Sequence, residues 1–307
     1  AAGETDEQLA ERLATAAGAI LKMRAHGGLE GKALGKAGDE QANAMLCREI
    51  RATRPADALL SEEEKDNIAR CGQSRVWIVD PLDGTREYGE GRDDWAVHVA
   101  LAVDGVATVG AVALPGLGIT LTSGTPAPLQ PANQPLRMLV SRTRPAAEAV
   151  FVAEKLCAEL VAMGSAGAKA MAVAGEADIY LHTGGQYEWD NCAPVAVAQA
   201  VGLHVSRVDG SPIRYNNPDT YLPDLLICRP ELAEQVLAPV VEGPFLPALG
   251  DVGIHRCGIV ADHLQQTVNI QTFHQLGGFV LGVAAFLHRL LKQIVKGFFQ
   301  CFISVHT

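Results

Sequence analysis

Two carboxylates three positions apart are the side chains of this sequence best suited to chemistry. They belong to the segment Trp77-Ile78-Val79-Asp80-Pro81-Leu82-Asp83-Gly84-Thr85. An apolar strand delivers Asp80 at its end, and the proline after it enforces a turn, so Asp83 lies close enough to share a cation. Gly84 permits close backbone approach, and Thr85 can begin a helix whose N–H groups hold a phosphate. Because carboxylates suit Mg²⁺, which often completes its shell with substrate phosphate, the segment predicts a magnesium site facing a phosphate.

Two further acidic groups follow predicted apolar elements. Glu62-Glu63-Glu64 comes soon after the run at 58–60, and Asp190 begins an alanine-rich helix that ends at Val201. Taken alone, the glutamates are equally well explained as a solvated loop and Asp190 as a helix N-cap. From the residues alone, both interpretations stay open for each group.

Hydrophobic periodicity predicts the elements that must position these residues. In the first half it changes from helical spacing to the short runs of strands, and Asp104-Gly105 provides the turn of a hairpin. Later, strands and helices alternate, which is typical of an α/β protein with layered sheets and helices. The predicted helices are 7–24, one that begins near Asp39 as its N-terminal anion and stops at Pro55, 146–163 and 189–201, and the predicted strands are 58–60, 76–79, 96–103, 106–114, 137–140 and 178–181.

A proline-rich stretch from Ser123 to Pro135 separates two halves of the chain. We expect an N-terminal α+β half at 1–125 with the metal-binding motifs, and a C-terminal α/β half at 136–249 that completes the site. The composition changes near Gly250, and the apolar run at 276–287 is too short to span a bilayer. We interpret 250–307 as an extension without chemistry that catalysis does not need, against the alternative of a membrane-surface helix.

The overall composition excludes several classes of protein. A chain of 307 residues with 48% hydrophobic content can bury a sizeable core. Its formal charge of -10 repels a nucleic-acid backbone, so no nucleic-acid polymer is expected as a partner. The seven cysteines show no paired spacing, which predicts reduced thiols. The first residues lack the pattern of a signal peptide, so we expect a cytoplasmic protein with no membrane partner.

These motifs resemble those of the inositol monophosphatase superfamily of Mg²⁺-dependent, lithium-sensitive phosphatases. The resemblance covers roughly residues 7 to 240 and includes Asp39, Leu60-Ser61-Glu62-Glu63, the segment 77–85, and the stretch from Gly164 to Trp189-Asp190. Within the superfamily, Gly-Arg-Asp-Asp-Trp-Ala-Val-His at 91–98 and Tyr-Leu-His-Thr-Gly-Gly-Gln-Tyr-Glu-Trp-Asp at 180–190 are most similar to CysQ-type 3′(2′),5′-bisphosphate nucleotidases. The resemblance implies an α/β fold, a layered α-β-α-β-α sandwich.

The resemblance also implies the ligands of two Mg²⁺ ions. Glu62, Asp80 and the carbonyl of Leu82 would hold one ion, and Asp80, Asp83 and Asp190 would hold the other. Some family members recruit a third ion near the glutamate. Two cations about 3.5–4 Å apart can activate a water on one side and stabilise the leaving alkoxide on the other, so no nucleophilic side chain is required.

A second set of implied roles concerns the attacking water and the phosphate. Thr85, paired with Asp39, would orient or deprotonate the water, while the amides of Gly84 and Thr85 would bind the phosphate. The sequence departs from the family at one place. The family usually has a threonine shortly before the helix aspartate, whereas Lys36-Ala37-Gly38 precedes Asp39 here.

The expected partner is a small phosphorylated metabolite, a bisphosphorylated nucleotide. Adenosine 3′,5′-bisphosphate would be hydrolysed to AMP, and the corresponding phosphosulfate is a further candidate. Tyr180 and Tyr187 offer aromatic surface for a purine, and Arg142 and Arg144 could neutralise the phosphate that is not cleaved. If the tyrosines pack in the core and the arginines face solvent, small phosphate esters would be hydrolysed with little preference.

Three other functions stay open. One is inositol monophosphatase or fructose-1,6-bisphosphatase activity. A second is a phosphoaspartate-forming phosphatase, although its motif spaces the acids Asp-x-Asp. The third is a catalytically silent Mg²⁺- or nucleotide-binding module. His98 lies between two valines of a strand and is interpreted as a buried histidine without a catalytic role. The sequence does not decide the oligomeric state, and a homodimer remains open.

Overall fold

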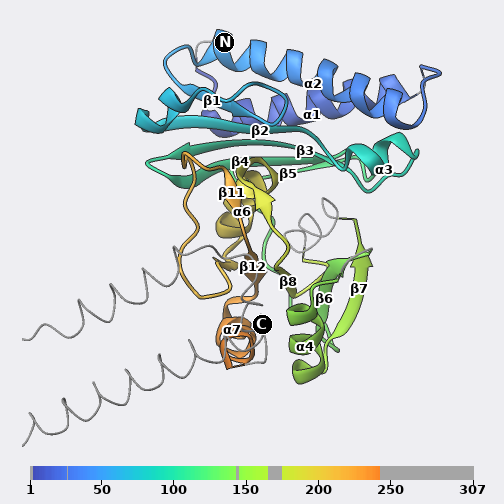
Figure 1. Ribbon diagram of the computed structural model, residues 1–307, viewed down its shortest axis with the longest axis vertical. Helices are drawn as coiled ribbons and strands as arrows, with labels where there is room; N and C mark the ends of the chain where they lie inside the picture. The colour runs from blue at the N-terminus through green and yellow to red at the C-terminus, as the bar shows by residue number, and fades with distance from the viewer. Residues whose placement is uncertain (1–2, 26, 143–144, 165–174, 243–307) are drawn as a thin grey trace, which may run out of the picture. The chain divides into compact units, whose positions relative to one another are not determined.

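The computed structural model describes residues 3–25, 27–142, 145–164 and 175–242. Arg144, most of the stretch between Gly164 and Asp178, and the extension at 250–307 lie outside these residues. Two five-stranded sheets form the framework, with strand orders β1-β2-β3-β4-β5 and β10-β12-β8-β6-β7, and β9 pairs with β11 separately (Figure 1). The strands are β1 (Ala58–Ser61), β2 (Arg75–Asp83), β3 (Ala96–Val103), β4 (Val106–Leu114), β5 (Ile119–Thr122), β6 (Arg137–Ser141), β7 (Glu159–Met163), β8 (Ile179–His182), β9 (Gln186–Tyr187), β10 (His204–Ser206), β11 (Tyr221–Leu222) and β12 (Leu225–Cys228).

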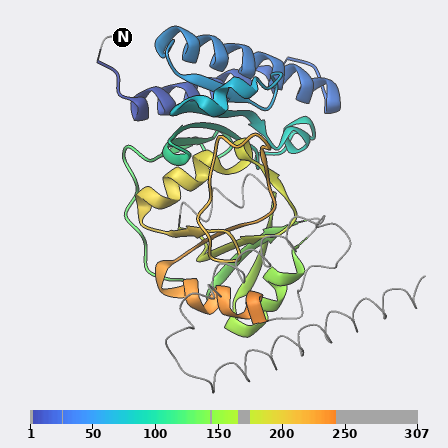
Figure 2. The same ribbon diagram turned by 60° about the vertical axis from the view of Figure 1, so that its left-hand side comes forward.

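Helices cover both sheets and separate them. Helices α1 and α2 cover one face of the first sheet, and α6 packs on its other face, towards the second sheet (Figures 1 and 2). Helices α4 and α7 lie together on the far face of the second sheet. The order of layers is therefore α-β-α-β-α, as predicted. The helices are α1 (Asp6–Ala25), α2 (Gly31–Thr53), α3 (Thr85–Gly89), α4 (Ala147–Leu156), α6 (Glu188–Val201) and α7 (Ala233–Glu242), with 3₁₀ turns η1 (Ile68–Gly72) and η2 (Pro230–Leu232).

The hairpin of β3 and β4 has the predicted bounds. Asp104 and Gly105 both adopt positive φ, at 50° and 75°. Two successive residues in this region give a turn whose twist matches that of the strands, and Asp-Gly tolerates the conformation well. Local turn chemistry therefore places the two central strands of the first sheet side by side.

Two predicted helices differ from the structure, and several strands, among them β5 and β9 to β12, lie outside the predictions. Helix α2 begins at Gly31, so the prediction that it starts near Asp39 is wrong. The predicted helix 146–163 is also wrong beyond Leu156, because Cys157 adopts a left-handed φ of 51° and the next residues form β7. Residues 159–163 pair in parallel with β6, a long-range contact that overrides a local apolar pattern.

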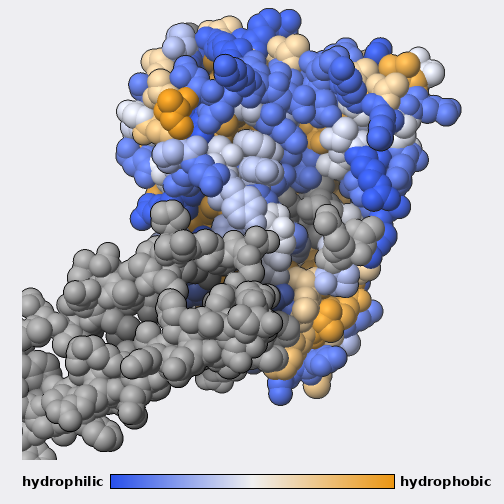
Figure 3. Space-filling model, in the orientation of Figure 1, coloured by the Kyte–Doolittle hydropathy of each residue, from blue (hydrophilic) through white to orange (hydrophobic). Residues whose placement is uncertain are grey.

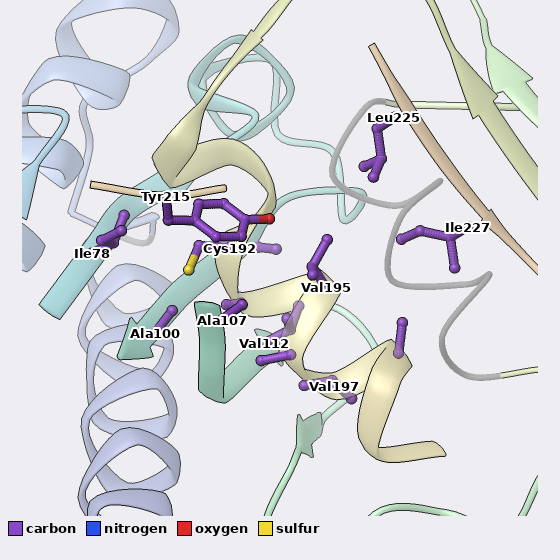
Figure 4. Close-up of a cluster of buried hydrophobic side chains, with 14 of the residues drawn as sticks. Ile78, Ala100, Ala107, Val112, Cys192, Val195, Val197, Tyr215, Leu225 and Ile227 are labelled. Carbon is purple, nitrogen blue, oxygen red and sulfur yellow. The ribbon is translucent and has the colours of Figure 1, made fainter. Parts of the chain in front are cut away.

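Helix α6 fills the space between the two sheets. Its Cys192 and Val195 are buried against side chains of the first sheet, such as Ile78 and Val112, and belong to the same cluster as Ile227 of β12 (Figure 4). The N-terminal end of this helix carries Asp190. Any change in the packing of α6 therefore moves a predicted metal ligand.

The surface differs from the core in polarity. None of the described helices is long and apolar enough to cross a membrane. On the face in Figure 3, hydrophilic residues predominate over the first half of the chain and apolar ones appear as separate patches. Large exposed apolar side chains come from different elements, among them Met23, Ile68, Leu117 and Leu160.

Gly110 provides a test of the contact between α6 and the first sheet. A Cβ atom at this position of β4 would lie 2.5 Å from the Ala193 carbonyl oxygen and 2.8 Å from the Ala196 Cβ. We expect Gly110→Ala to lower the free energy of unfolding by about 1–3 kcal/mol, as overpacking does, and to lower activity because α6 carries Asp190. Chemical denaturation measures the loss. Gly72→Ala is the control, because a Cβ there meets nothing within 4 Å. Equal stability of the two variants would contradict this packing.

Candidate active site

Strand β2 carries the two central carboxylates, Asp80 and Asp83, which are 1% and 8% exposed. Residues three apart in a regular strand point to opposite faces of the sheet. Here Asp80 pairs with His98 and Asp83 with Ala96, so β2 has one more residue than β3 over this interval. This β-bulge turns both carboxylates to the same side. The strand was predicted to end at Asp80, and the structure instead continues it through the bulge to Asp83.

Hydrogen bonds within residues 80–85 hold the bulged segment in place. The Leu82 N–H donates to Asp80 Oδ1 at 3.0 Å, and the Thr85 hydroxyl donates to the Leu82 carbonyl at 3.0 Å. Gly84 adopts φ of 94°, a conformation that L side chains rarely adopt, and serves as the N-cap of α3. Thr85 therefore begins a helix, as predicted, and its hydroxyl lies beside the acidic strand end.

Glu62 reaches the same end of the sheet from β1. This strand runs parallel to β2, Ser61 pairs with Val79, and the Glu62 N–H donates to the Val79 carbonyl at 3.3 Å. Protein atoms crowded around its carboxylate, followed by the charges of Asp190 and Asp83, raise the pKa of Glu62 to about 7. The side chain nevertheless keeps contact with solvent. Glu62 thus lies at the solvent-facing side of the acidic cluster.

Asp190 comes from the first turn of α6. Its Oδ2 accepts a hydrogen bond of 2.6 Å from the Tyr187 N–H, so it caps the helix from the third helical position and Tyr187 is the N-cap residue. The start of α6 is also anchored by the buried Glu188. The carboxylate of Glu188 accepts from the N–H groups of Asn216 and Asn217 at 2.7 and 2.8 Å. These contacts fix where Asp190 stands relative to β2.

Burial and mutual repulsion act together on Asp80. Its pKa is raised well above the usual range, first by burial and then by the charges of Glu62, Asp83 and Asp190. Four carboxylates from β2, the end of β1 and the start of α6 therefore share one electrostatic environment. A cluster of this kind fits hard divalent cations, because their charge offsets the repulsion and their preferred ligands are carboxylate oxygens.

Asp39 lies in the middle of α2, and it faces Thr85 because α2 contains glycines. A Cβ at Gly35 would lie 2.8 Å from Thr85 Cγ2, and one at Gly38 would lie 2.8 Å from the Tyr88 ring. The two helices can therefore approach closely. Burial, followed by the charges of Glu63 and Glu62, raises the pKa of Asp39 to about 7, against a hydrogen bond with Thr85 that lowers it. The structure thus brings Asp39 to the site, although not at a helix start.

His98 is a member of the site that the sequence did not identify. It is fully buried, as expected, but its Nε2 lies 3.6 Å from Asp83 Oδ2 and its Nδ1 lies 3.3 Å from the Trp189 carbonyl oxygen. One ligand atom each from Asp80, Asp83 and His98 lie within 4.8 Å of one another. The pairing of His98 with Asp80 in the sheet is the signal that could have revealed it.

A cavity of about 430 Å³ adjoins Asp190. Its wall includes Ser141 at the end of β6, Glu148 of α4, and Tyr180, while Tyr187 is not among the described lining residues. Tyr180 is only 2% exposed, and its hydroxyl accepts from Gln186 Nε2 at 3.2 Å. Tyr187 is 47% exposed and stacks on Trp189 at 4.9 Å. Tyr180 therefore packs in the core and has almost no ring surface accessible to a purine, whereas Tyr187 is exposed but does not line this cavity.

Comparisons with known proteins agree with this architecture. Residues 4–243 match the model of the inositol monophosphatase family. A 3′-phosphoadenosine 5′-phosphate phosphatase of Mycobacterium tuberculosis is 50% identical over 239 residues, 73% of this chain and 88% of that protein. One of Mycobacterium leprae is 49% identical over 257 residues, 78% and 94% of the two chains. The crystal structure of CysQ from Bacteroides thetaiotaomicron superposes with a TM-score of 0.64 and 22% identity, over 74% of this chain and 98% of that one.

The chain therefore belongs to the inositol monophosphatase family. Enzymes of this family are metal-dependent, which agrees with the fit of the acidic cluster to divalent cations.

The raised pKa values predict how pH affects the metal-free protein. Asp39 and Glu62 titrate near pH 7 in the folded protein, against about 4 in an unfolded chain. Between these values the folded state binds more protons, so its stability falls as pH rises. With a chelator present, we expect the melting temperature to be lower at pH 8 than at pH 5.5. Mg²⁺ should raise it more at pH 8. A metal-free melting temperature that increases from pH 5.5 to pH 8 would contradict the raised pKa values of Asp39 and Glu62.

Asp80→Asn tests the origin of this effect. Removing the central charge should raise the metal-free melting temperature at pH 8 by roughly 2–4 °C, the shift that about 1 kcal/mol produces in a domain of this size. The same variant should lose most of the Mg²⁺-induced increase. Asp93→Asn is the control, because Asp93 is exposed and lies outside the cluster. A response to Mg²⁺ that survives in Asp80→Asn would remove Asp80 from the metal site.

Proposed function

We propose that this protein is a Mg²⁺-dependent phosphatase that removes the 3′-phosphate from adenosine 3′,5′-bisphosphate, producing AMP and inorganic phosphate. The observation that supports it best is the gathering of Glu62, Asp80, Asp83 and Asp190, the last of which lines a cavity of about 430 Å³. The mycobacterial relatives, about half identical to this chain, carry the name of this activity. A cavity of this volume is within the range of small-molecule sites.

The proposed ligands follow from the placement of the carboxylates. Glu62, Asp80 and the Leu82 carbonyl would hold one Mg²⁺, and Asp80, Asp83 and Asp190 would hold a second. Asp80 suits the position between the two ions because the charges of all three other carboxylates act on it. Bound Mg²⁺ supplies the positive charge that activates a water and stabilises the leaving oxygen.

Thr85 and Asp39 would orient the water that attacks phosphorus. The Thr85 hydroxyl can donate one hydrogen bond at a time, to the Leu82 carbonyl or to Asp39, and in either case its oxygen can accept a hydrogen bond from a water. Asp39, with a pKa of about 7, can hold or release a proton at neutral pH. The amides of Gly84 and Thr85, at the start of α3, are proposed to bind the phosphate oxygens.

The nucleoside would occupy the cavity beside Asp190. Tyr180 and His182 line it and stack on each other with ring centroids 6.2 Å apart and an interplanar angle of 7°. Glu148 accepts a hydrogen bond of 2.7 Å from the Thr183 hydroxyl at the same wall. Because Tyr180 is almost fully buried, His182 supplies the accessible ring, and an aromatic ring beside polar groups suits a purine nucleoside better than a simple polyol.

Asp83→Asn tests the metal-dependent mechanism. Loss of one ligand charge should lower kcat by roughly 10²–10³, the effect of removing one electrostatic contact to a transition state, while the far-UV spectrum stays unchanged. Phosphate release from adenosine 3′,5′-bisphosphate at saturating Mg²⁺ measures it, with Asp93→Asn as control. Wild-type activity that persists in excess chelator would overturn the metal-dependent mechanism.

Substrate preference tests the assignment of the nucleotide. We expect kcat/KM for adenosine 3′,5′-bisphosphate to exceed that for inositol 1-phosphate and fructose 1,6-bisphosphate by at least about tenfold, because only the nucleotide has a purine for the cavity and a second phosphate on the same ribose. A tenfold ratio corresponds to about 1.4 kcal/mol. A preference for the inositol ester would overturn the substrate and leave the metal mechanism intact.

A further inference from the structure

Two arginines from distant parts of the chain share one carboxylate beside the proposed active site. Arg92 binds Asp94 through both of its carboxylate oxygens, with Nε–Oδ1 and Nη2–Oδ2 distances of 2.8 and 3.0 Å. Arg142, at the end of β6, donates from Nη2 to Asp94 Oδ2 at 2.8 Å. Among the described residues, neither arginine has another ion-pair partner within 4.0 Å. The group of three, called the Arg92–Asp94–Arg142 triad below, therefore carries one excess positive charge.

The triad is held against the phosphate-binding motif. A Cβ at Gly84 would lie 3.1 Å from the Trp95 Cβ and 3.5 Å from the Asp94 carbonyl oxygen. Gly84 stands between Asp83 and Thr85, so the loop with Asp94 rests directly on the motif. On another side, a Cβ at Gly164 would lie 2.8 Å from Asp94 Oδ2. Close contacts with glycines of two other segments thus fix the position of the Asp94 carboxylate.

The triad also lies next to the nucleoside cavity. Arg142 directly follows Ser141, which lines the cavity together with Asp190. Its side chain reaches from that rim to the loop that covers Gly84. The triad therefore connects the loop that rests on Gly84 with the end of β6, whose Ser141 lines the cavity, and none of its three residues is itself in the described lining.

Both guanidinium groups keep donors for a ligand. Arg92 and Arg142 are 38% and 39% exposed at their side chains, whereas the shared Asp94 is 19% exposed. A guanidinium has five N–H donors, and the contacts to Asp94 use two on Arg92 and one on Arg142. Because Asp94 restricts the orientation of both side chains, less conformational entropy is lost when they bind an anion.

We propose that the Arg92–Asp94–Arg142 triad binds the phosphate that is not cleaved and so selects doubly phosphorylated nucleotides over singly phosphorylated ones. The proposal rests on the proposed function and makes it more specific. Two guanidinium groups, each with paired N–H donors in one plane, bind a phosphate dianion better than lysine ammonium groups do. Asp94 is a positioning residue, since it touches the arginines and carries the wrong charge to touch phosphate. Arg142 was a sequence-based candidate, whereas Arg92 and Asp94 come from the structure.

A pair of matched substrates tests this inference. Adenosine 3′,5′-bisphosphate and adenosine 3′-monophosphate share the nucleoside and the cleaved phosphate, and differ only in the 5′-phosphate. We expect Arg92→Ala and Arg142→Ala each to lower kcat/KM for the bisphosphate about 10- to 150-fold, the factor that corresponds to lost hydrogen bonds to a charged group. The loss should appear mainly in KM. For the monophosphate, kcat/KM should stay within about twofold. This substrate has no 5′-phosphate, so removing an arginine that binds the 5′-phosphate takes no interaction away from it.

Arg12→Ala is the control in the full chain. Arg12 also binds a carboxylate with two hydrogen bonds, to Glu4 at 2.7 and 2.9 Å, but on α1. It should leave both substrates unaffected. Arg142→Lys, which keeps the charge without the fork, should recover part of the preference.

The possible outcomes separate the triad from the proposed function. Variants that keep the wild-type preference for the bisphosphate overturn the triad and leave the function standing. Variants that lose both substrates equally also overturn it, because the arginines would then serve the fold or the chemical step. If the wild-type protein hydrolyses the monophosphate but not the bisphosphate, both proposals fall. A collapse of the preference in both arginine variants supports the triad.

Discussion

The repulsion among four neighbouring carboxylates, two of them buried, is the constraint on which the rest of this structure depends. Asp80 is almost fully buried and is surrounded by the charges of Glu62, Asp83 and Asp190. Without a cation, such an arrangement is destabilising, and burial together with repulsion raises the pKa of Asp80 and of Glu62. The surrounding elements are therefore built to hold like charges together. A fold that relaxed this crowding would be more stable alone and a poorer binder of divalent metal.

Several separate structural features hold these carboxylates close together. A β-bulge turns Asp80 and Asp83 to the same side of the first sheet, and a parallel neighbour brings Glu62 to the same strand end. Asp190 comes from a helix that the other sheet helps to hold in place. The buried His98 spans the distance between Asp83 and the backbone at Trp189. Because the ligands come from β2, from the residue after β1 and from the first turn of α6, the site forms only when α6 is packed against the first sheet.

The positive groups of the site stand outside this cluster. Arg92 and Arg142 bind Asp94 and do not neutralise the carboxylates of β2. In the proposed function, this separation leaves the metal ligands negative and puts cationic charge where the second phosphate would bind. Such a division suits a substrate with two phosphates, one for the metals and one for the arginines. Metal dependence is shared by the family.

Local sequence determined the segments that carry the chemistry. The apolar run before Asp80, the glycine at 84 and the Asp-Gly turn at 104–105 act through backbone preferences of neighbouring residues, and the structure has them where the sequence predicts. Tertiary structure alone decided that Asp39 lies in mid-helix, that residues 159–163 form a strand, that His98 contacts the backbone at Trp189, and that Arg142 reaches Asp94. Each depends on partners tens of residues away in the sequence. Periodicity indicates which face of an element is apolar, but not which distant element covers that face. The burial of a side chain and the shift of its pKa depend on that covering element.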